Sequence, residues 1–217
     1  MTEPRFTKKP DGIWGVRMPL APSRLPFFYG WVIVFAATIG SIFSIPGQTM
    51  GFSVFTDVLI EELGLSRLQL SLAYCLGTVA SGLTLPWLGR VLDRWGERRM
   101  AVASVLATGL VFFYMANCNV ISQSHGQAIP AATAAFVVIV LGFYMIRAAA
   151  QGVLSMTCRN AIGKWFDHRR GLALAISGVL VSFSYSFAPR GLDWLIDRYG
   201  YDGAWLRMGV VTIVIMG

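Results

Sequence analysis

Long apolar runs alternate with short charged segments along this chain. Residues 25–56, 68–89 and 171–189 contain no charged side chain, and between residues 100 and 146 His125 is the one ionisable residue of the usual kind. A bilayer core about 30 Å thick needs roughly 20 apolar residues in a helix to cross it. A soluble core does not require several such runs in one chain. The pattern therefore predicts an all-α polytopic membrane protein.

Six membrane spans are predicted from the apolar runs. The first runs from residue 27 to about 45, and at Pro46-Gly47 its helix either continues or breaks. Residues 51–64 are expected to contain the end of this helix and an external loop. The second opens at Ser66, whose Ser-x-x-Gln pattern is that of a capping box, and ends near residue 88. The other spans are expected at residues 100–116, 129–158 and 171–188 and from about 204 onward, with a polar loop at 117–127.

The two ends of the chain complete the predicted domain organisation. Residues 1–26 are polar and lack the apolar core of a cleavable signal peptide, so they are expected to form an N-terminal tail. Residues 27–217 are expected to form the transmembrane bundle. Its sixth span has too few residues left to cross a bilayer, which favours a fragment whose last helix is truncated.

Charged residues make up 13% of the chain, about half of the share of roughly 25% in soluble domains. In a soluble protein, the net charge of +7 would suggest binding to nucleic acid. Here the basic residues interrupt membrane spans, so the chain is expected to contact the lipid bilayer and not to bind nucleic acid. Thirteen of the 18 Lys and Arg residues fall on the side of the N-terminal tail and four on the other side. Because positive charge collects in the cytoplasm, the N-terminus is predicted to be cytoplasmic, in a bacterial inner (plasma) membrane.

Signals of catalysis and metal binding are missing from the sequence. Cys75, Cys118 and Cys158 are widely spaced without a Cys-x-x-Cys or Cys/His pattern, so neither a metal site nor a disulfide framework is predicted. No Gly-Lys-Ser/Thr loop for phosphate is present, and no nucleophile lies beside a base. The chain is therefore predicted not to be an enzyme and to use no cofactor.

Two similar pentads indicate an internal repeat. Leu-Asp-Arg-Trp-Gly at residues 92–96 follows the second predicted span, and Ile-Asp-Arg-Tyr-Gly at residues 196–200 follows the fifth. Three spans separate the pentads, so they are expected on opposite faces of the membrane. An odd number of spans per repeat gives inverted-topology repeats, as in many secondary transporters. The expected architecture is a six-helix bundle of two inverted three-helix repeats.

The segment at residues 89–99 resembles the loop between helices two and three of the major facilitator superfamily. The pattern is carried by Gly89, Asp93, Arg94, Gly96 and Arg98, whereas Val91 and Glu97 depart from it. The resemblance implies a cytoplasmic gate with glycine turns, a carboxylate and guanidinium groups that pair with carboxylates. It also implies the N-terminal half of a twelve-helix transporter, with a C-terminal six-helix half as its partner and alternating access as its mechanism.

A narrower resemblance is carried by residues 28–34, 51–55 and 164–173. These segments are similar to the first-helix region and the entry to helix five in monocarboxylate transporters and oxalate–formate antiporters. The resemblance implies a small organic anion as substrate.

Arg147 lies deep in the fourth predicted span, where a charged side chain is costly and marks a functional site by default. It shares one predicted helical stripe with Tyr144, Gln151 and Ser155. Arg147 and Gln151 also resemble the superfamily's Arg…Gln-Gly motif of helix four, with one residue more between them. Arg147 is expected to attract the anion, while Tyr144 and Gln151 orient it. The alternative is a structural arginine bonded to carbonyl groups or paired with Asp93.

Hydroxyl-bearing and small residues give weaker signals. Ser41 and Gln48 in the first span are further candidates for substrate contact, although hydroxyls in membrane helices most often bond their own backbone or a neighbouring helix. Small residues recur at every fourth position over residues 73–81 and 178–186, and both ridges are predicted to be packing or sliding surfaces.

Together these observations predict a secondary active transporter that moves small organic anions by alternating access. Two alternatives stay open at this point: a sugar or drug carrier of the same superfamily, and a non-transporting six-helix scaffold or receptor.

Overall fold

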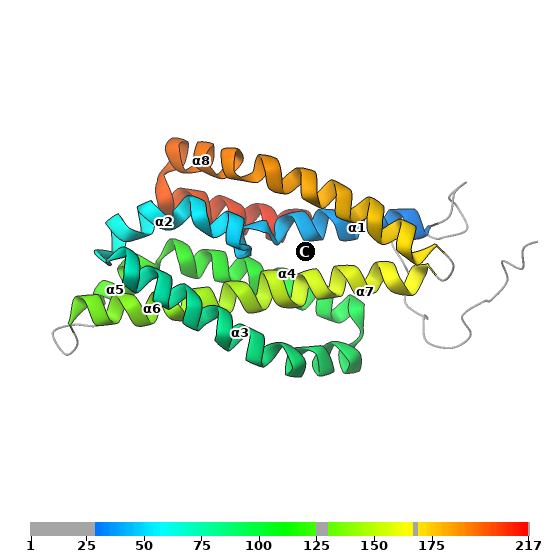
Figure 1. Cartoon of the computed structure of the whole chain (residues 1–217), viewed down its shortest axis with the longest axis horizontal. Coiled ribbons are helices and arrows are strands. Elements are labelled where there is room, and N and C mark those ends of the chain that lie inside the picture. The colour runs from blue at the N-terminus through cyan, green and yellow to red at the C-terminus, as the bar shows by residue number, and fades with distance from the viewer. Residues whose placement is uncertain (1–28, 125–129, 167–168, 217) are drawn as a thin grey trace, which may run out of the picture.

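The structure is a computed structural model that describes residues 29–124, 130–166 and 169–216, and every regular element within these ranges is helical (Figure 1). The predicted tail at residues 1–26 lies outside the described residues. In chain order the elements are α1 (Gly30–Phe43), η2 (Ile45–Gly47), α2 (Thr49–Leu63), α3 (Arg67–Trp95), α4 (Glu97–Ala116), α5 (Cys118–Gln123), α6 (Ala131–Ile146), η4 (Arg147–Leu154), α7 (Ser155–Trp165) and α8 (Arg170–Met216).

These elements combine into six spans in the described part of the chain. The first span consists of α1, η2 and α2, the second and third are α3 and α4, and the fourth runs without interruption through α6, η4 and α7. α8 bends at Gly200 into two arms, the fifth and sixth spans, which run alongside each other (Figure 1). Four described stretches are long and apolar enough to cross a membrane: Arg67–Trp95, Glu97–Ala116, Ala131–Trp165 and Arg170–Met216. The predicted all-α membrane fold is confirmed.

The first span is longer than the sequence suggests. The prediction of a helix end and a loop over residues 51–64 is wrong, because α2 continues to Leu63. Phe55 and Leu59, one turn apart, are both fully buried and Leu63 follows one turn later. The acidic residues that suggested a loop occupy the exposed side of the same helix. The predicted break at Pro46-Gly47 is confirmed as the short 3₁₀ turn η2.

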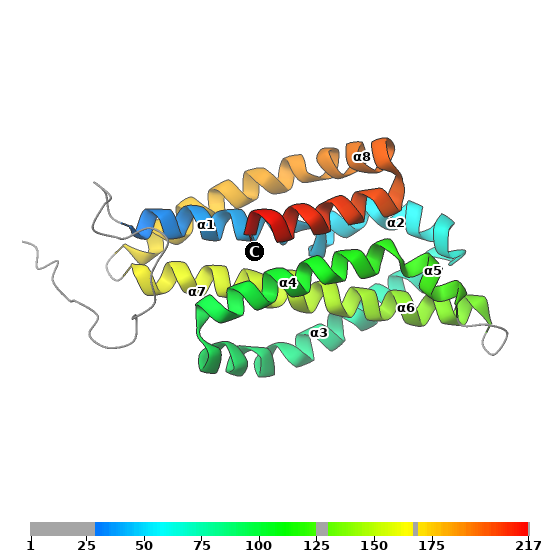
Figure 2. The ribbon, with the colours of Figure 1, turned by 180° about the vertical axis from the view of Figure 1, so that it is seen from behind.

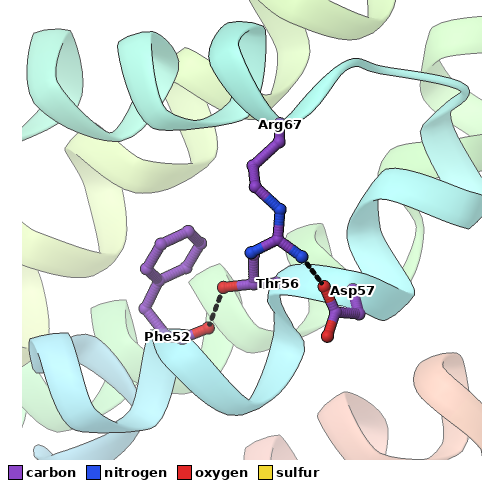
Figure 3. Close-up of polar contacts among 4 residues, drawn as sticks. All are labelled: Phe52, Thr56, Asp57 and Arg67. Carbon is purple, nitrogen blue, oxygen red and sulfur yellow. Dashed lines mark hydrogen bonds and ion pairs between the residues drawn. The ribbon is translucent and has the colours of Figure 1, made fainter.

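The turn between α2 and α3 follows local sequence rules. α2 ends at Gly64 in the left-handed conformation (φ 62°), which glycine adopts without a Cβ clash. The Ser66 hydroxyl accepts a hydrogen bond from the backbone N–H of Gln69, and the Gln69 side chain accepts one from the Ser66 N–H, so the predicted capping box is confirmed. An exposed ion pair between Arg67 and Asp57 joins the two helices near this turn (Figure 3).

The two three-span repeats share their irregularities. Gly96 after α3 and Gly200 in α8 lie 104 residues apart and adopt nearly the same backbone, with φ 77° and ψ 158° against φ 72° and ψ 173°. Pro86 and Pro189 lie inside the two helices that precede these glycines. The α3–α4 turn and the bend of α8 lie at opposite ends of the bundle (Figure 1). The predicted inverted repeat is therefore present in the backbone.

An aromatic core fills the bundle near the bend of α8. Trp205, only 2% exposed, stacks on Phe55 with 4.3 Å between ring centroids and contacts Phe112 at 5.5 Å. Tyr201 donates a hydrogen bond of 2.7 Å to the Met115 carbonyl. The second arm of α8 lies beside α4 in the rear view (Figure 2). Rings from α2, α4 and α8 thus hold the spans of both repeats together.

Two other spans extend beyond their predicted bounds. The fourth continues to Trp165 rather than ending at Cys158, and the sixth begins at Tyr201 rather than near Ala204, because the positive-φ Gly200 lets one helix follow the other directly. Part of the predicted loop at 117–127 is the helix α5, and residues 125–127 lie outside the described residues. Cys118 of α5 is fully buried, and this burial raises the pKa of its thiol despite the hydrogen bond to Tyr201.

Basic segments gather at one end of the bundle. This end of the bundle holds the start of α1, the α3–α4 turn, the end of α7 and the start of α8 (Figure 1). The opposite end holds α5 and the bend of α8. The basic clusters around the α3–α4 turn and around the end of α7 therefore share one end, as the charge pattern predicts.

Candidate functional site

Arg147 stands where α6 passes into the π-helical segment η4. Its Nη1 donates a hydrogen bond of 2.7 Å to the Tyr74 hydroxyl, and its guanidinium carbon lies 5.1 Å from the centre of the Tyr74 ring. Among the described residues, no carboxylate forms an ion pair with Arg147. The alternative of a pair with Asp93 is therefore wrong. Since a guanidinium has five N–H donors, Arg147 keeps donors for a further acceptor.

Tyr74 is held in place by neighbouring rings and by a hydroxyl. The Tyr74 hydroxyl lies 2.8 Å from Oγ1 of Thr49 in the first turn of α2. Its ring stacks on Phe52 of α2 at 4.4 Å and meets Phe143 of α6 edge-on at 5.5 Å. The Phe52 side chain is directed from α2 toward α3, the helix that carries Tyr74 (Figure 3). Side chains from the first and fourth spans therefore fix Tyr74 beside Arg147.

Close contact between α3 and α6 sets the position of this pair. A Cβ at Gly77 would lie 2.7 Å from the Phe143 Cβ and 2.9 Å from the backbone nitrogen of Tyr144, so a larger residue would push the helices apart. Ala73 and Ser81 on the same ridge are also buried. The ridge over residues 73–81 is thus a packing surface. It brings Tyr74, one turn before Gly77, against the fourth span.

The broken first span and the π-helical segment of the fourth meet beside Arg147. A Cβ at Gly47 would lie 2.8 Å from the Ala150 Cβ and 2.9 Å from the Ile146 carbonyl oxygen. A small cavity of about 10 Å³ lies at this contact, with Arg147 in its wall. A cavity of this size holds about one water molecule. The contact between the two irregular segments therefore leaves no room for an organic anion on this side of Arg147.

A wider hollow runs between α1 and the first arm of α8. It has a volume of about 570 Å³ and is lined mostly by apolar side chains, with Thr38 and Ser184 as its hydroxyl-bearing residues. Cavities of this size hold small molecules in other proteins. Arg147 does not line this groove, which we call the α1–α8 groove.

The site offers one positive charge among aromatic rings and hydroxyls. An arginine stays protonated at any physiological pH and binds carboxylates through paired N–H donors. Among the described residues there is no group of three or more His, Cys, Asp or Glu that could hold a metal ion. The chemistry that this arrangement supports is the binding of an anion.

The predicted stripe through Arg147 does not form one face of a helix. Arg147 contacts Tyr74 of α3, whereas Ser155 donates a hydrogen bond of 3.0 Å to the Ser44 hydroxyl in the first span. Hydrogen bonds in a π-helix run from residue i to i+5, so residues after Arg147 turn differently from those in an α-helix. Tyr144 and Gln151 are half-buried, and the hydrogen bonds of the described residues join neither to Arg147.

The polar candidates in the first span bond within that span. The Ser41 hydroxyl donates to the Ala37 carbonyl at 2.9 Å, and Gln48 Nε2 donates to the Ser44 hydroxyl at 3.4 Å. This is the usual role of polar side chains in membrane helices. The structure brings neither Ser41 nor Gln48 into hydrogen-bond contact with Arg147.

The segment predicted to form the gate is mostly helical. Because α3 continues to Trp95, Gly89, Asp93 and Arg94 lie in its last turns rather than in a loop. Of the two glycines expected to form turns, both within the described residues, only Gly96 has a positive φ. The side chains of Asp93, Arg94 and Arg98 are exposed, and none takes part in an ion pair among the described residues.

Glu97, one of the departures from the expected pattern, has a specific partner. Its carboxylate forms an ion pair with Lys164 in the last turn of α7, and its side chain is 18% exposed. Glu97 lies in the first turn of α4, where a negative charge also interacts favourably with the helix dipole. The pair joins the third span to the end of the fourth.

Comparison with known proteins decides the family. The sequence model described as Major Facilitator Superfamily matches residues 32–217. The chain belongs to the major facilitator superfamily. It is also 25% identical over 205 residues to a chloramphenicol resistance protein of Pseudomonas aeruginosa, in an alignment that covers 89% of this chain and 44% of that protein. The chain thus spans less than half of the length of this relative. No solved structure matches it.

Members of the major facilitator superfamily are membrane transporters, so the broader of the two resemblances is confirmed. The narrower resemblance to monocarboxylate and oxalate–formate carriers gains no support from the relative, whose name refers to drug resistance.

The structure explains one departure from the superfamily's pattern. By the resemblance described above, this chain has one residue more than the common motif between Arg147 and Gln151. This segment is the π-helix η4, in which each hydrogen-bonded turn takes one residue more than in an α-helix. A π-helical turn can accommodate one extra residue of this kind while the fourth span stays continuous.

Sequence reasoning missed Tyr74 and Thr49 as members of the site. Tyr74 lies beside the small-residue ridge over residues 73–81, and nothing in its local sequence distinguishes it from other aromatic residues of the spans. The available signal was its place one turn before Gly77, where a helix with small residues approaches a neighbour. Thr49 lies two residues after the predicted break at Pro46-Gly47.

Proposed function

We propose that this chain is the N-terminal six-helix half of a secondary transporter that moves small organic anions by alternating access. Arg147 carries the proposal, because it places a permanent charge deep in the fourth span with a neutral phenol as its hydrogen-bond partner. A central arginine costs about 2.5–3.5 kcal/mol on insertion scales. Attraction of an anionic substrate into the membrane gives this charge a function.

A C-terminal six-helix half is the proposed partner. Of the described residues in the first arm of α8, three are buried, namely Ala173, Ser177 and Leu192. The small-residue ridge over residues 178–186 is exposed instead of packed. Ridges of this kind permit close contact between helices, whereas lipid chains gain little from them. In this proposal, the ridge and the α1–α8 groove face the second half and the substrate pathway lies between the halves.

Uptake into vesicles that contain the protein from the complete reading frame tests the anion site. Arg147→Gln should lower uptake of radiolabelled oxalate and lactate about ten- to hundredfold, as expected for loss of a charged hydrogen bond of ~1.5–3 kcal/mol. Arg207→Gln is the matched control, since Arg207 lies in the sixth span, stacks over Tyr199 and donates to the Gly203 carbonyl. Undiminished uptake of both anions by the Arg147 variant would refute the proposed site.

A drug carrier is the second candidate function. The relative's name refers to chloramphenicol resistance, and the mostly apolar lining of the α1–α8 groove suits an uncharged molecule. Radiolabelled chloramphenicol in the same vesicles distinguishes the two. Chloramphenicol transport that exceeds anion transport and survives Arg147→Gln would favour the drug carrier. Transport of none of these solutes would favour the non-transporting scaffold.

We further propose that the basic end of the bundle faces the cytoplasm of a bacterial inner membrane. Gln123 at the end of α5 and Arg169 before α8 are both exposed, so each is a suitable position for a single cysteine in a background without the native ones. A membrane-impermeant maleimide added to whole cells should label Gln123→Cys and spare Arg169→Cys. The reverse labelling would invert the proposed orientation.

A further inference from the structure

Tyr74 connects the charge of Arg147 to the first span. Its hydroxyl accepts the hydrogen bond from Arg147 Nη1 at 2.7 Å and lies 2.8 Å from Thr49 Oγ1. A phenol can accept one hydrogen bond and donate its own proton, so a single hydroxyl can serve both neighbours. Thr49 belongs to the first turn of α2, two residues after the break at Pro46-Gly47. Three residues from three spans thus form one continuous contact.

The ring of Tyr74 has little freedom to move. Phe52 lies parallel to it, at 10° between ring planes, and Phe143 packs against it nearly perpendicularly, at 82°. Arg147 by contrast has a long side chain whose ordering costs conformational entropy. A hydrogen bond to a fixed phenol orders the guanidinium before a ligand arrives, and this preorganisation lowers the cost of binding.

The group formed by Thr49, Tyr74 and Arg147 is accessible from one side. Thr49 is exposed, and Tyr74 and Arg147 are half-buried, so the group is reached from the surface of the described chain rather than sealed in its core. With one N–H donating to Tyr74, the other guanidinium donors stay available to a carboxylate.

We propose that Tyr74 is a positioning residue for the Arg147 anion site and that Thr49 holds Tyr74 through its hydroxyl. This inference rests on the proposed function. Tyr74 does not bind the substrate; it holds the guanidinium in the orientation in which it receives a carboxylate. Loss of the Tyr74 hydroxyl should therefore weaken anion binding without changing the rate at which a bound anion is carried.

The first test measures KM and the maximal rate of oxalate and lactate uptake by the complete protein in vesicles. Tyr74→Phe keeps the ring and its stacking but removes the hydroxyl, and it should raise KM about three- to tenfold at an unchanged maximal rate. Thr49→Val should shift KM in the same direction by a smaller factor, and Thr49→Ser, which retains a hydroxyl, should restore it.

Tyr114→Phe is the matched control. Tyr114 also donates its hydroxyl to a partner across a helix contact, the Val138 carbonyl at 2.9 Å, but its bond joins α4 to α6 away from Arg147. This variant loses one tyrosine hydroxyl from the bundle and should leave KM unchanged. Equal shifts of KM in Tyr114→Phe and Tyr74→Phe would indicate a general loss of structure and overturn the positioning role.

A double-mutant cycle separates this inference from the proposed function. If Tyr74 acts through Arg147, Tyr74→Phe should have no further effect on KM in an Arg147→Gln background. Additive effects would overturn the positioning role. Normal uptake by Arg147→Gln alone would refute the anion site and this inference with it, whereas impaired uptake by Arg147→Gln with wild-type KM in Tyr74→Phe would refute the positioning role alone.

Discussion

The two arms of α8 belong to one stretch of helix but differ sharply in how they are packed. The second arm buries five of its described residues, from Tyr201 to Thr212, although it is the shorter arm. The first arm buries three and exposes large side chains such as Phe183, Phe187 and Trp194. In a bilayer, exposed apolar surface alone does not identify a docking face, because lipid covers it equally well. In the proposed arrangement, the exposed glycine and serine residues of the first arm mark the face toward the second half.

The contact between α4 and the second arm shows what a completed helix interface looks like in this chain. A Cβ at Gly209 would lie 3.3 Å from the Gly109 carbonyl oxygen, and Ile213 fills the space in front of Gly109. Gly178 of the first arm has no atom within 4 Å of its virtual Cβ. Both arms carry a glycine on the helix surface. Within the described chain, Gly209 of the second arm packs against another helix and Gly178 of the first arm does not.

The largest difference between the arms is expected in the loss of stability when a tryptophan of each arm is replaced by alanine. Trp205→Ala removes a ring packed between Phe55 and Phe112 and should lower the free energy of unfolding by about 3–5 kcal/mol. Trp194→Ala is the control on the first arm, where Trp194 is 60% exposed, and should change it by less than about 0.5 kcal/mol. Thermal unfolding in detergent measures both. Similar losses for the two variants would contradict the contrast in packing.

Leucine in place of glycine should affect the arms in different ways. Gly209→Leu overpacks the contact with α4 and should destabilise the bundle by about 1–3 kcal/mol. Gly178→Leu enters open space and should leave the stability of this half unchanged. It should nevertheless reduce transport by the complete protein, because the leucine would hold the proposed second half away from the ridge. Normal transport by Gly178→Leu would argue that the ridge faces lipid.

The two pentads extend the comparison to the two repeats. Asp93 and Asp197 are both exposed and occupy equivalent positions. Asp93→Asn should slow transport about tenfold with normal expression, as expected for loss of one charged hydrogen bond of ~1.5 kcal/mol formed in one state of the cytoplasmic gate that the family resemblance implies. Asp197→Asn should have the smaller effect, because the gate resemblance is carried by residues 89–98. Equal effects would instead assign a gating role to both repeats.

The smallest effect on stability is expected for the exposed ion pair between Glu97 and Lys164, near the end of α7. Lys164→Glu reverses the charge opposite Glu97 and should cost less than about 1 kcal/mol, since the Lys164 side chain is 68% exposed. Glu97→Lys combined with Lys164→Glu should recover most of the loss. Thermal unfolding at low salt is the appropriate measurement, because salt screens exposed pairs. Lack of recovery in the double variant would indicate that Glu97 contributes through the helix dipole rather than through Lys164.

The sequence by itself determined the number and order of the spans, the break at Pro46-Gly47, the capping box at Ser66 and the inverted repeat. Each of these depends on local chemistry: apolar length against bilayer thickness, a proline that removes a donor, a serine that satisfies helix N–H groups, and glycines at equivalent positions. The acids of α2 suggest a loop in the sequence, because composition alone does not show which side of a helix a residue occupies.

Tertiary structure decided the surroundings of Arg147. No proline or glycine at Arg147 marks the start of the π-helical segment η4 in the sequence. The segment lies where the fourth span packs against Gly47. Tyr74 became the partner of Arg147 because Gly77 lets α3 approach α6, a contact between residues more than 60 positions apart. Periodicity describes one isolated helix, whereas the partner of a buried charge depends on which neighbouring helix comes close enough to reach it.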